Sequence, residues 1–466
     1  MVRTDNGQKR NSLIRKNVFY SFLTKGWAGV VQLLMVPLTI FCLGDYENGV
    51  WLTVNSFLIW TESLDIGLGN GLRNRLAVYW ANGDMEKARQ SVSSTFFTLM
   101  FIMLPIAVVL LILINTLDIY HILNVSPAIV ENLRAVYTVS LILVCAHFVI
   151  KFIGNVYLGM QLPAVNNALV VGGQTLALVI IFVLSRLKPL DNMLMWVAVA
   201  NTLSPLLIYL AAYPITFYKK FPELRPSIRY FKTAMVGELF GLGFQFFLLQ
   251  MAGIIIFASS NAIISRIVSP AMVTPYQVAY RYFSLTMMIF TVIGVPFWTA
   301  TTDAYERCDM RWISQSMRRM NYILLGFVAM LTLMVVVSKP VYHIWVGSGI
   351  EIPILLSIGM ALYMMIIITS LYYSYFLNGF GYLRVQLIMT LTSAAVYIPL
   401  SVAMGRSFGV VGVIFALCIV NIPGAIVNRI QFNKLIRGIE LLFNRNGQKL
   451  FRNFSLIIYY MIIIPK

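Results

Sequence analysis

Long apolar runs separated by short polar segments dominate this chain, and they constrain its fold more than any other feature. Hydrophobic residues make up 59% of the 466 residues and charged residues only 11%, against about 25% charged residues in a soluble domain. A helix needs roughly 20 apolar residues to cross the hydrocarbon core of a bilayer, because each residue adds about 1.5 Å to its length. The sequence therefore predicts an all-α polytopic membrane protein.

About twelve runs approach or reach that length. We expect membrane helices over 18–43, 49–68, 91–115, 133–158, 165–185, 193–217, 236–259, 275–301, 322–337, 352–377, 385–404 and 410–427. A basic cytoplasmic connector over 219–235 separates six helices from the other six, a layout typical of transporters built from repeats. This division predicts an N-terminal six-helix lobe over 1–218, a C-terminal lobe over 236–430, and a basic amphipathic tail over 431–466 on the membrane surface.

The basic residues lie mostly on one side of the predicted spans. The N-terminus, the loops that follow even-numbered helices and the C-terminus hold most of the 35 lysines and arginines. Cytoplasmic loops carry such an excess, so we expect both termini in the cytoplasm. The net charge of +18 then reflects membrane topology, and no compact basic module indicates nucleic-acid binding.

The sequence contains no pattern that indicates a metal or a cofactor. Its four cysteines and three histidines are scattered, with neither the spacing of metal ligands nor a disulfide framework. It also lacks a nucleotide-binding motif, which argues against direct use of ATP. The first apolar run is too long for a cleavable signal peptide, so we expect it to remain as an anchor.

Besides Arg134, which lies at the start of its predicted span, three basic residues lie within the predicted spans. Each of the three calls for a reason, because a charge at the centre of a membrane helix costs roughly 3 kcal/mol on insertion scales. They are Lys25, Lys151 and Arg281. Neither Lys151 nor Arg281 has a carboxylate in its own predicted helix. We predict that all three face a water-filled cavity and bind an anionic substrate; snorkelling to the membrane interface is the alternative, above all for Arg281.

Two carboxylates, Glu62 and Asp65, end the second predicted helix and share one face of it through their i,i+3 spacing. Counted by the rise per residue, Lys25 lies at a similar depth in the first helix. One interpretation is a structural ion pair near the cytoplasmic interface. The other is a carboxylate whose protonation or cation binding is coupled to a conformational change.

The stretch 49–77 continues from these acids into three glycines, Arg73 and Arg75, and reads GVWLTVNSFLIWTESLDIGLGNGLRNRLA. We expect the glycines to end the helix. The stretch resembles the second-helix signature of bacterial O-antigen and polysaccharide flippases of the Wzx type. These flippases belong to the multidrug/oligosaccharidyl-lipid/polysaccharide exporter superfamily. The DIGLGNGLRN core carries the resemblance, and over the rest of the chain only the helix layout is similar.

The resemblance implies two six-helix lobes around a central cavity in the bacterial inner membrane. It implies that an undecaprenyl-diphosphate-linked oligosaccharide, such as an O-antigen repeat unit for lipopolysaccharide, is flipped from the cytoplasmic to the periplasmic leaflet by alternating access. It also implies a cationic lumen for the diphosphate, which agrees with the interpretation of Lys25, Lys151 and Arg281. The polysaccharide polymerase machinery would be a candidate partner, and a proton or sodium ion a candidate coupling ion.

Two other functions stay open from the sequence. A cation-coupled multidrug antiporter of the same superfamily would use acidic lumen residues, whereas the predicted lumen is net basic. A membrane polymerase or transferase would need catalytic groups at a membrane face, and the longest external loop, 116–132, offers only Asp118, His121 and Glu131. We therefore expect a transporter and not an enzyme.

Overall fold

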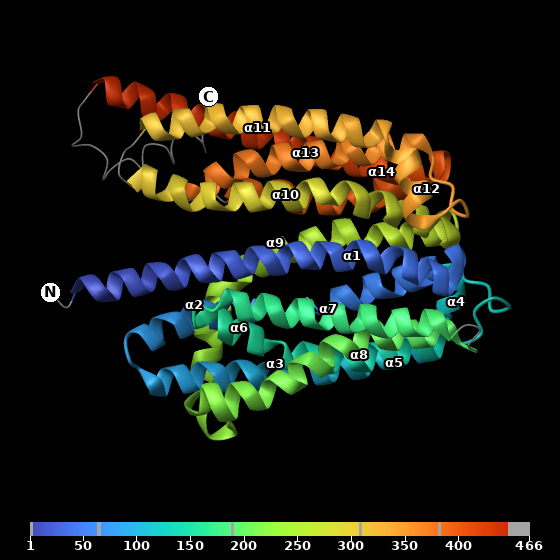
Figure 1. The fold of residues 1–466 in the computed structure, drawn as a ribbon, viewed down its shortest axis with the longest axis horizontal. Coiled ribbons are helices and arrows are strands. Elements are labelled where there is room, and N and C mark those ends of the chain that lie inside the picture. Colours follow the sequence, from blue (N-terminus) through green and yellow to red (C-terminus); the bar gives the residue numbers. More distant parts are fainter. Residues whose placement is uncertain (1–2, 63–66, 188–190, 307–309, 381–383, 446–466) are drawn as a thin grey trace. The chain divides into compact units, whose positions relative to one another are not determined.

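The computed structural model describes residues 3–62, 67–187, 191–306, 310–380 and 384–445, and their regular structure is helical (Figure 1). The α-helices are α1 (Arg3–Glu62), α2 (Leu68–Ala81), α3 (Met85–Thr116), α4 (Ile119–Leu123), α5 (Leu133–Ile150), α6 (Phe152–Gly159), α7 (Pro163–Arg186), α8 (Met193–Pro214), α9 (Thr233–Ile267), α10 (Val273–Glu306), α11 (Met310–Val336), α12 (Ser338–Val346), α13 (Ile354–Gly379) and α14 (Arg384–Arg445). Shorter helical turns are η1 (Ile215–Lys220), η2 (Pro222–Leu224), η3 (Ile228–Tyr230) and η4 (Pro270–Met272).

Within the described residues, 8 segments are long and apolar enough to cross a membrane. Two of them contain a glycine with positive φ, Gly44 in α1 and Gly409 in α14, a backbone conformation that glycine adopts without steric cost. Each of these segments therefore comprises two helices. With 35 and 34 residues, α9 and α10 also exceed the roughly 20 residues that a crossing requires. The predicted all-α polytopic membrane fold is confirmed.

The chain forms two compact units. Unit 1 comprises Met1–Arg281, Pro340–Ile352 and Ser401–Val413, and unit 2 comprises Tyr282–Lys339, Pro353–Leu400 and Ile414–Lys466. The lobe boundaries predicted on either side of the connector stay a prediction. Most of the predicted amphipathic tail, from residue 446 onward, lies outside the described residues.

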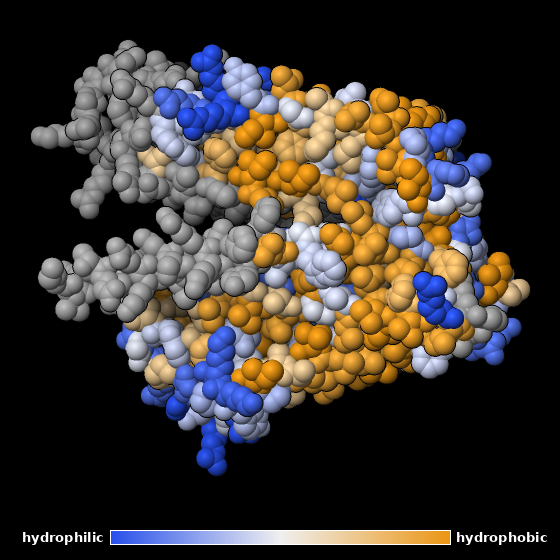
Figure 2. Space-filling view, in the orientation of Figure 1, coloured by the Kyte–Doolittle hydropathy of each residue, from blue (hydrophilic) through white to orange (hydrophobic). Residues whose placement is uncertain are grey.

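The core of unit 1 is built from helices that are apolar on their inner and outer faces alike. In it α7 packs against α1 and α8, and α8 packs against α5. Val50, Leu72 and Phe148 are fully buried between these and neighbouring helices. Exposed apolar side chains such as Val179 and Trp196 cover the outer surface of α7 and α8, while hydrophilic side chains gather at the ends of these helices (Figure 2). This distribution suits a surface that faces lipid.

The core of unit 2 is rich in aromatic residues from α10, α11 and α13. The rings of Phe290 and Phe327 meet edge to face with centroids 5.5 Å apart, a favourable arrangement for aromatic quadrupoles. Tyr372 is fully buried, and its hydroxyl donates to Asn321 Oδ1 at 2.9 Å. This bond satisfies the polar end of a side chain whose ring belongs to the core.

The glycines of the signature stretch do not all end a helix. α1 ends at Glu62, and Gly67 takes the left-handed conformation before α2. Gly69 and Gly71, by contrast, lie inside α2, so the prediction was wrong for these two. A Cβ atom at Gly71 would lie 2.3 Å from the carbonyl oxygen of Leu239 in α9. The missing side chain therefore serves a close contact between α2 and α9.

The first half of α1 contains a proline, and a tryptophan of α12 compensates for the hydrogen bond that this proline removes. Pro37 has no N–H, so the carbonyl of Leu33, four residues earlier, loses its partner within the helix. The indole Nε1 of Trp345, in α12, donates to this Leu33 oxygen at 2.9 Å. The side chain thus replaces the backbone donor that proline removes.

Candidate functional site

A small polar pocket lies inside unit 1, between α1, α8 and α10. Its volume is about 60 Å³. The lining residues, which we call the polar pocket, are Met35, Val36, Thr39, Asn48, Trp51, Leu52, Asn55, Asn201, Thr274, Gln277, Val278 and Arg281. So many amide and hydroxyl groups among apolar helices need hydrogen-bond partners, and these partners determine how the pocket is built.

The first group of bonds joins α1 to the start of α10. Asn48 is 3% exposed, and its Nδ2 donates to Thr274 Oγ1 at 3.1 Å. Thr274 Oγ1 in turn donates to the backbone oxygen of Asp45 at 2.6 Å. Next to Asn48, a Cβ atom on Gly49 would lie 1.8 Å from the carbonyl oxygen of Pro270. Glycine therefore lets the two backbones approach closely enough for these bonds to form.

The second group of bonds runs from α10 through α9 to α1. Gln277 Nε2 donates to Asn261 Oδ1 at 2.7 Å. Asn261 Nδ2 donates to Ser56 Oγ at 2.7 Å and to the backbone oxygen of Leu52 at 3.2 Å. One asparagine thus connects three helices, and the chain of bonds fixes the orientation of Gln277 at the pocket.

The remaining groups give the pocket its chemical character. Arg281 supplies a guanidinium, and none of the lining residues named above is an acid. Asn48 Oδ1 is buried and has no hydrogen-bond partner among the described residues. A guanidinium surrounded by amides and hydroxyls can hold an anionic oxygen and bond to neighbouring hydroxyl groups.

The site residues predicted from the sequence lie in different places in the structure. Arg281 lines the polar pocket, whereas Lys25 and Lys151 are not among its lining residues. Lys25 is exposed on α1, and Lys151 lies at the break between α5 and α6 with its ammonium 5.2 Å from the centroid of the Phe148 ring. The proposed roles of both lysines stay predictions. The side chain of Glu62 and the whole of Asp65 lie outside the described residues.

Sequence reasoning missed Asn48, Thr274 and Gln277. Gln277 precedes Arg281 by four residues, so the two share a helix face, and this spacing was a usable signal. Asn48 and Thr274 are 226 residues apart. No local pattern connects them, and their partnership becomes visible only in the folded chain.

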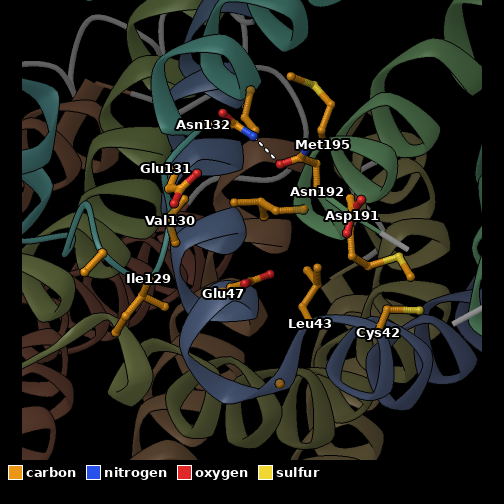
Figure 3. Close-up of a pocket in the computed structure, with 15 residues that line it drawn as sticks. Cys42, Leu43, Glu47, Ile129, Val130, Glu131, Asn132, Asp191, Asn192 and Met195 are labelled. Atoms are coloured by element: carbon orange, nitrogen blue, oxygen red, sulfur yellow. Dashed lines mark hydrogen bonds between the residues drawn. The ribbon is translucent and has the colours of Figure 1, made fainter. Parts of the chain in front are cut away.

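A second, larger pocket opens at the end of unit 1 where α1 turns at Gly44. Its volume is about 540 Å³, and the carboxylates of Glu47, Glu131 and Asp191 belong to its lining (Figure 3). The amides of Asn132 and Asn192 are hydrogen-bonded to each other across it. Within the described residues no three His, Cys, Asp or Glu side chains lie close enough to hold a metal ion. We infer no metal site from this pocket.

The external loop considered for an enzyme uses its polar groups to build local structure. The carboxylate of Asp118 accepts a bond from the backbone nitrogen of His121 at 3.1 Å and so caps α4. The hydroxyl of Tyr120 donates to the backbone oxygen of Glu131 at 2.5 Å. The side chains of Asp118 and Tyr120 thus stabilise the loop, whereas His121 and Glu131 take part in these bonds through their backbone.

The signature stretch contributes an ion pair at the other end of unit 1. Arg75 Nε of α2 lies 2.9 Å from Glu238 Oε1 of α9. Tyr79, also in α2, donates its hydroxyl to the same carboxylate oxygen at 2.8 Å. Burial, together with this bond to Glu238, raises the pKa of Tyr79 to about 12. The shared carboxylate of Glu238 thus joins two side chains of α2 to α9.

Comparison with solved structures identifies this arrangement of helices. An inward-facing multidrug resistance MATE family transporter of the MOP superfamily matches with a TM-score of 0.76 and 16% identity, over 88% of this chain and 95% of that one. An outward-facing one matches with a TM-score of 0.63 and 18% identity, over 91% and 96%. This chain has the MATE transporter fold. No family model and no curated protein matches the sequence.

The comparisons agree with the predicted helix layout at the level of the fold. A crystal structure of MATE in the straight conformation also matches, with a TM-score of 0.59 and 17% identity, over 90% of this chain and 97% of that one. The multidrug resistance proteins named here are transporters and not enzymes. None of the similar structures named here is a flippase of the Wzx type, so that narrower resemblance rests on residues 49–77 alone.

Proposed function

We propose that this chain is a membrane transporter that works by alternating access. Support comes from its fold, which is similar to those of transporters recorded in inward-facing and outward-facing conformations. The buried bonds of the polar pocket add to it. Asn48–Thr274 and Asn261–Gln277 join helices through a few exchangeable hydrogen bonds, which can break and re-form during a transport cycle at modest cost.

Export of small amphiphilic compounds is the substrate assignment that the comparisons favour. The similar structures belong to proteins named for multidrug resistance. On this proposal the protein is a cation-coupled antiporter, and Glu62 or Asp65 is the candidate coupling group. The comparisons support this assignment better than the flippase function that the sequence resemblance implied.

One observation favours lipid-linked oligosaccharide as a second candidate substrate. Arg281 lines the polar pocket without an accompanying acid in the lining, which suits a diphosphate better than a cationic drug. The pocket amides could bond to sugar hydroxyls. In that cycle the glycan would cross through the protein while the prenyl tail stays in lipid.

For either substrate we propose the bacterial inner membrane, with both termini in the cytoplasm. The ends of helices α2 and α3 that carry Arg73, Arg75 and Lys87 would then face the cytoplasm together with the connector. This orientation agrees with the excess of basic residues in cytoplasmic loops.

Transport in proteoliposomes tests the proposal. The purified chain would be reconstituted with a fluorescent undecaprenyl-diphosphate glycan or a cationic dye, each with and without an imposed proton or sodium gradient. Arg281→Gln is the test variant, and Arg134→Gln, an exposed arginine outside the polar pocket, is the matched control. Movement of neither probe would contradict the transporter proposal.

The two substrates give different patterns. If lipid-linked oligosaccharide is the substrate, movement of the glycan probe should fall at least tenfold in Arg281→Gln and stay unchanged in Arg134→Gln. If the protein exports small molecules, the imposed gradient should drive movement of the dye, and this movement should persist in both variants. Glycan movement that is the same in native protein and Arg281→Gln would remove the polar pocket as a diphosphate site.

A further inference from the structure

The connector between α8 and α9 folds into a basic surface with apolar side chains among its charges. Its exposed residues other than Pro222, which we call the connector patch, are Ile215, Tyr218, Lys219, Lys220, Arg225, Ile228, Arg229 and Lys232. Five of them are cationic, and residues 215–232 contain a single acid, Glu223. In Figure 2 hydrophilic side chains gather at the lower left, where the connector lies in Figure 1. The charge and the apolar side chains both require an explanation.

Hydrogen bonds between side chains of α3 and the backbone of the connector hold the connector in place. Arg89 Nε donates to the carbonyl oxygen of Glu223 at 2.8 Å. The backbone nitrogen of Ser227 donates to Ser93 Oγ at 3.2 Å, and that of Lys232 donates to Ser94 Oγ at 2.9 Å. The connector backbone that carries the patch is therefore attached to α3 at three points.

Buried side chains strengthen this attachment. Leu224 is fully buried and Phe221 nearly so, and the ring of Phe221 meets Trp80 edge to face with centroids 6.0 Å apart. Two of the cations are also ordered by aromatic rings, since Lys220 Nζ lies 4.7 Å from the centroid of Tyr157 and the Arg225 guanidinium 4.4 Å from that of Tyr218. Cation–π contacts leave the charge available to an anion on the outer side.

The apolar members of the patch distinguish it from an ordinary solvated charge cluster. Ile215, Tyr218 and Ile228 are 55%, 56% and 58% exposed. The candidate membrane span Met193–Lys220 ends within the patch, so Ile215 and Tyr218 lie at the end of an apolar span, beside the charges of the connector. Aromatic and aliphatic residues beside lysine and arginine at the end of a span are typical of a surface that enters the membrane interface.

We propose that the connector patch binds the headgroups of anionic phospholipids in the leaflet that it faces. The cations attract the phosphodiester groups, while Ile215, Tyr218 and Ile228 sit among the upper acyl carbons. Juxtamembrane basic clusters bind anionic lipid surfaces in this way. Lipid bound here would contact the connector, α3 and the end of α8 at once, so the composition of the leaflet would act on the stability of this end of unit 1.

Binding of fluorescent phosphatidylglycerol to the purified full chain in mixed micelles tests this proposal. The test pair is Lys219→Gln with Arg229→Gln. The matched control pair is Arg186→Gln with Arg266→Gln, which removes the same charge from exposed positions outside the patch. We expect the native chain to prefer phosphatidylglycerol to phosphatidylcholine and to bind it less tightly as salt rises.

Loss of each patch charge should weaken binding roughly fivefold, so the test pair should lose about 25-fold and the control pair less than threefold. Ile228→Ser should weaken binding while leaving its salt dependence unchanged. Lys219→Arg with Arg229→Lys should bind as the native chain does, which keeps the test valid if the glutamine pair does not fold.

Three results would overturn the proposal. Equal affinity of the native chain for phosphatidylglycerol and phosphatidylcholine would exclude headgroup recognition. Equal losses of lipid affinity in the two glutamine pairs would mean that binding depends on the total charge of the protein and not on the connector patch. Complete displacement of the lipid by millimolar inorganic phosphate would indicate a site for free phosphate. The measurement involves no transport, so its outcome is independent of the proposed function.

Discussion

The side chain of Asn261, in α9, connects three helices beside the polar pocket. Its amide bonds to Gln277 of α10 and to Ser56 and the Leu52 carbonyl of α1, and it is 4% exposed. Removing one buried partner leaves the others unsatisfied, which costs about 1–3 kcal/mol in proteins. In membranes the cost is often lower because the unfolded chain finds other partners.

Replacement of Asn261 by alanine should therefore lower the free energy of unfolding by about 1–2 kcal/mol. Asn115→Ala is the control, because Asn115 is exposed and its amide bonds to the Leu111 carbonyl of its own helix. Unfolding in mixed detergent micelles measures both. Equal losses would mean that the bonds between helices contribute nothing beyond a local side-chain effect.

At the scale of the helix, α1 contains a proline whose defect is repaired from a distant part of the chain. Trp345→Phe removes the donor to the Leu33 carbonyl while keeping the aromatic ring. We expect a loss of about 1 kcal/mol in unfolding free energy. In a Pro37→Ala background the alanine N–H can bond to Leu33 instead, so the same Trp345→Phe change should cost much less.

A double-mutant cycle on Trp345 and Pro37 measures this coupling in the same micelles. A coupling energy near about 1 kcal/mol would agree with the repair. A value of zero would show that Trp345 stabilises α1 only by packing.

The contact between α2 and α9 depends on the absence of a side chain at Gly71. Gly71→Ala would place a Cβ atom 2.3 Å from the Leu239 oxygen, and overpacking of this kind costs about 1–3 kcal/mol. Gly237→Ala, in α9 with nothing within 4 Å of its added Cβ, should be neutral or slightly stabilising. Comparable thermal stability of the two variants would contradict the close contact.

At the scale of the whole molecule, the spans could be predicted from the sequence and the site could not. Hydropathy and length identified the helices, because a membrane imposes the same requirement on every crossing. A general argument about buried charge drew attention to Arg281, which lines the polar pocket, and its anion-binding role stays a prediction. The hydrogen-bonded side chains around it could not be found in this way, since Asn48 and Asn261 bond to residues more than 200 positions away. Packing between helices determines which face of each helix is turned inward, and this cannot be read from a single sequence.

The orientation in the membrane is testable with single cysteines. In a Cys308→Ser background the other native cysteines, Cys42, Cys145 and Cys418, are buried. An impermeant maleimide added to spheroplasts should label Ile129→Cys and leave Pro222→Cys, in the connector, unlabelled, although both positions are exposed. Lysis should then expose Pro222→Cys to the reagent. The opposite pattern would place the connector outside the cell.

The bond between Asn48 and Thr274 also has a consequence for the order in which the protein is synthesised and assembled. The two residues are 226 positions apart, and a ribosome adds about 5–20 residues per second. Synthesis of Thr274 therefore follows that of Asn48 by about 10–45 s, and until then the Asn48 amide is without its native partner. During that interval the amide must be hydrated, bonded elsewhere or sheltered by the insertion machinery. Asn48 is thus a position where slower translation should increase the fraction of chains that misassemble.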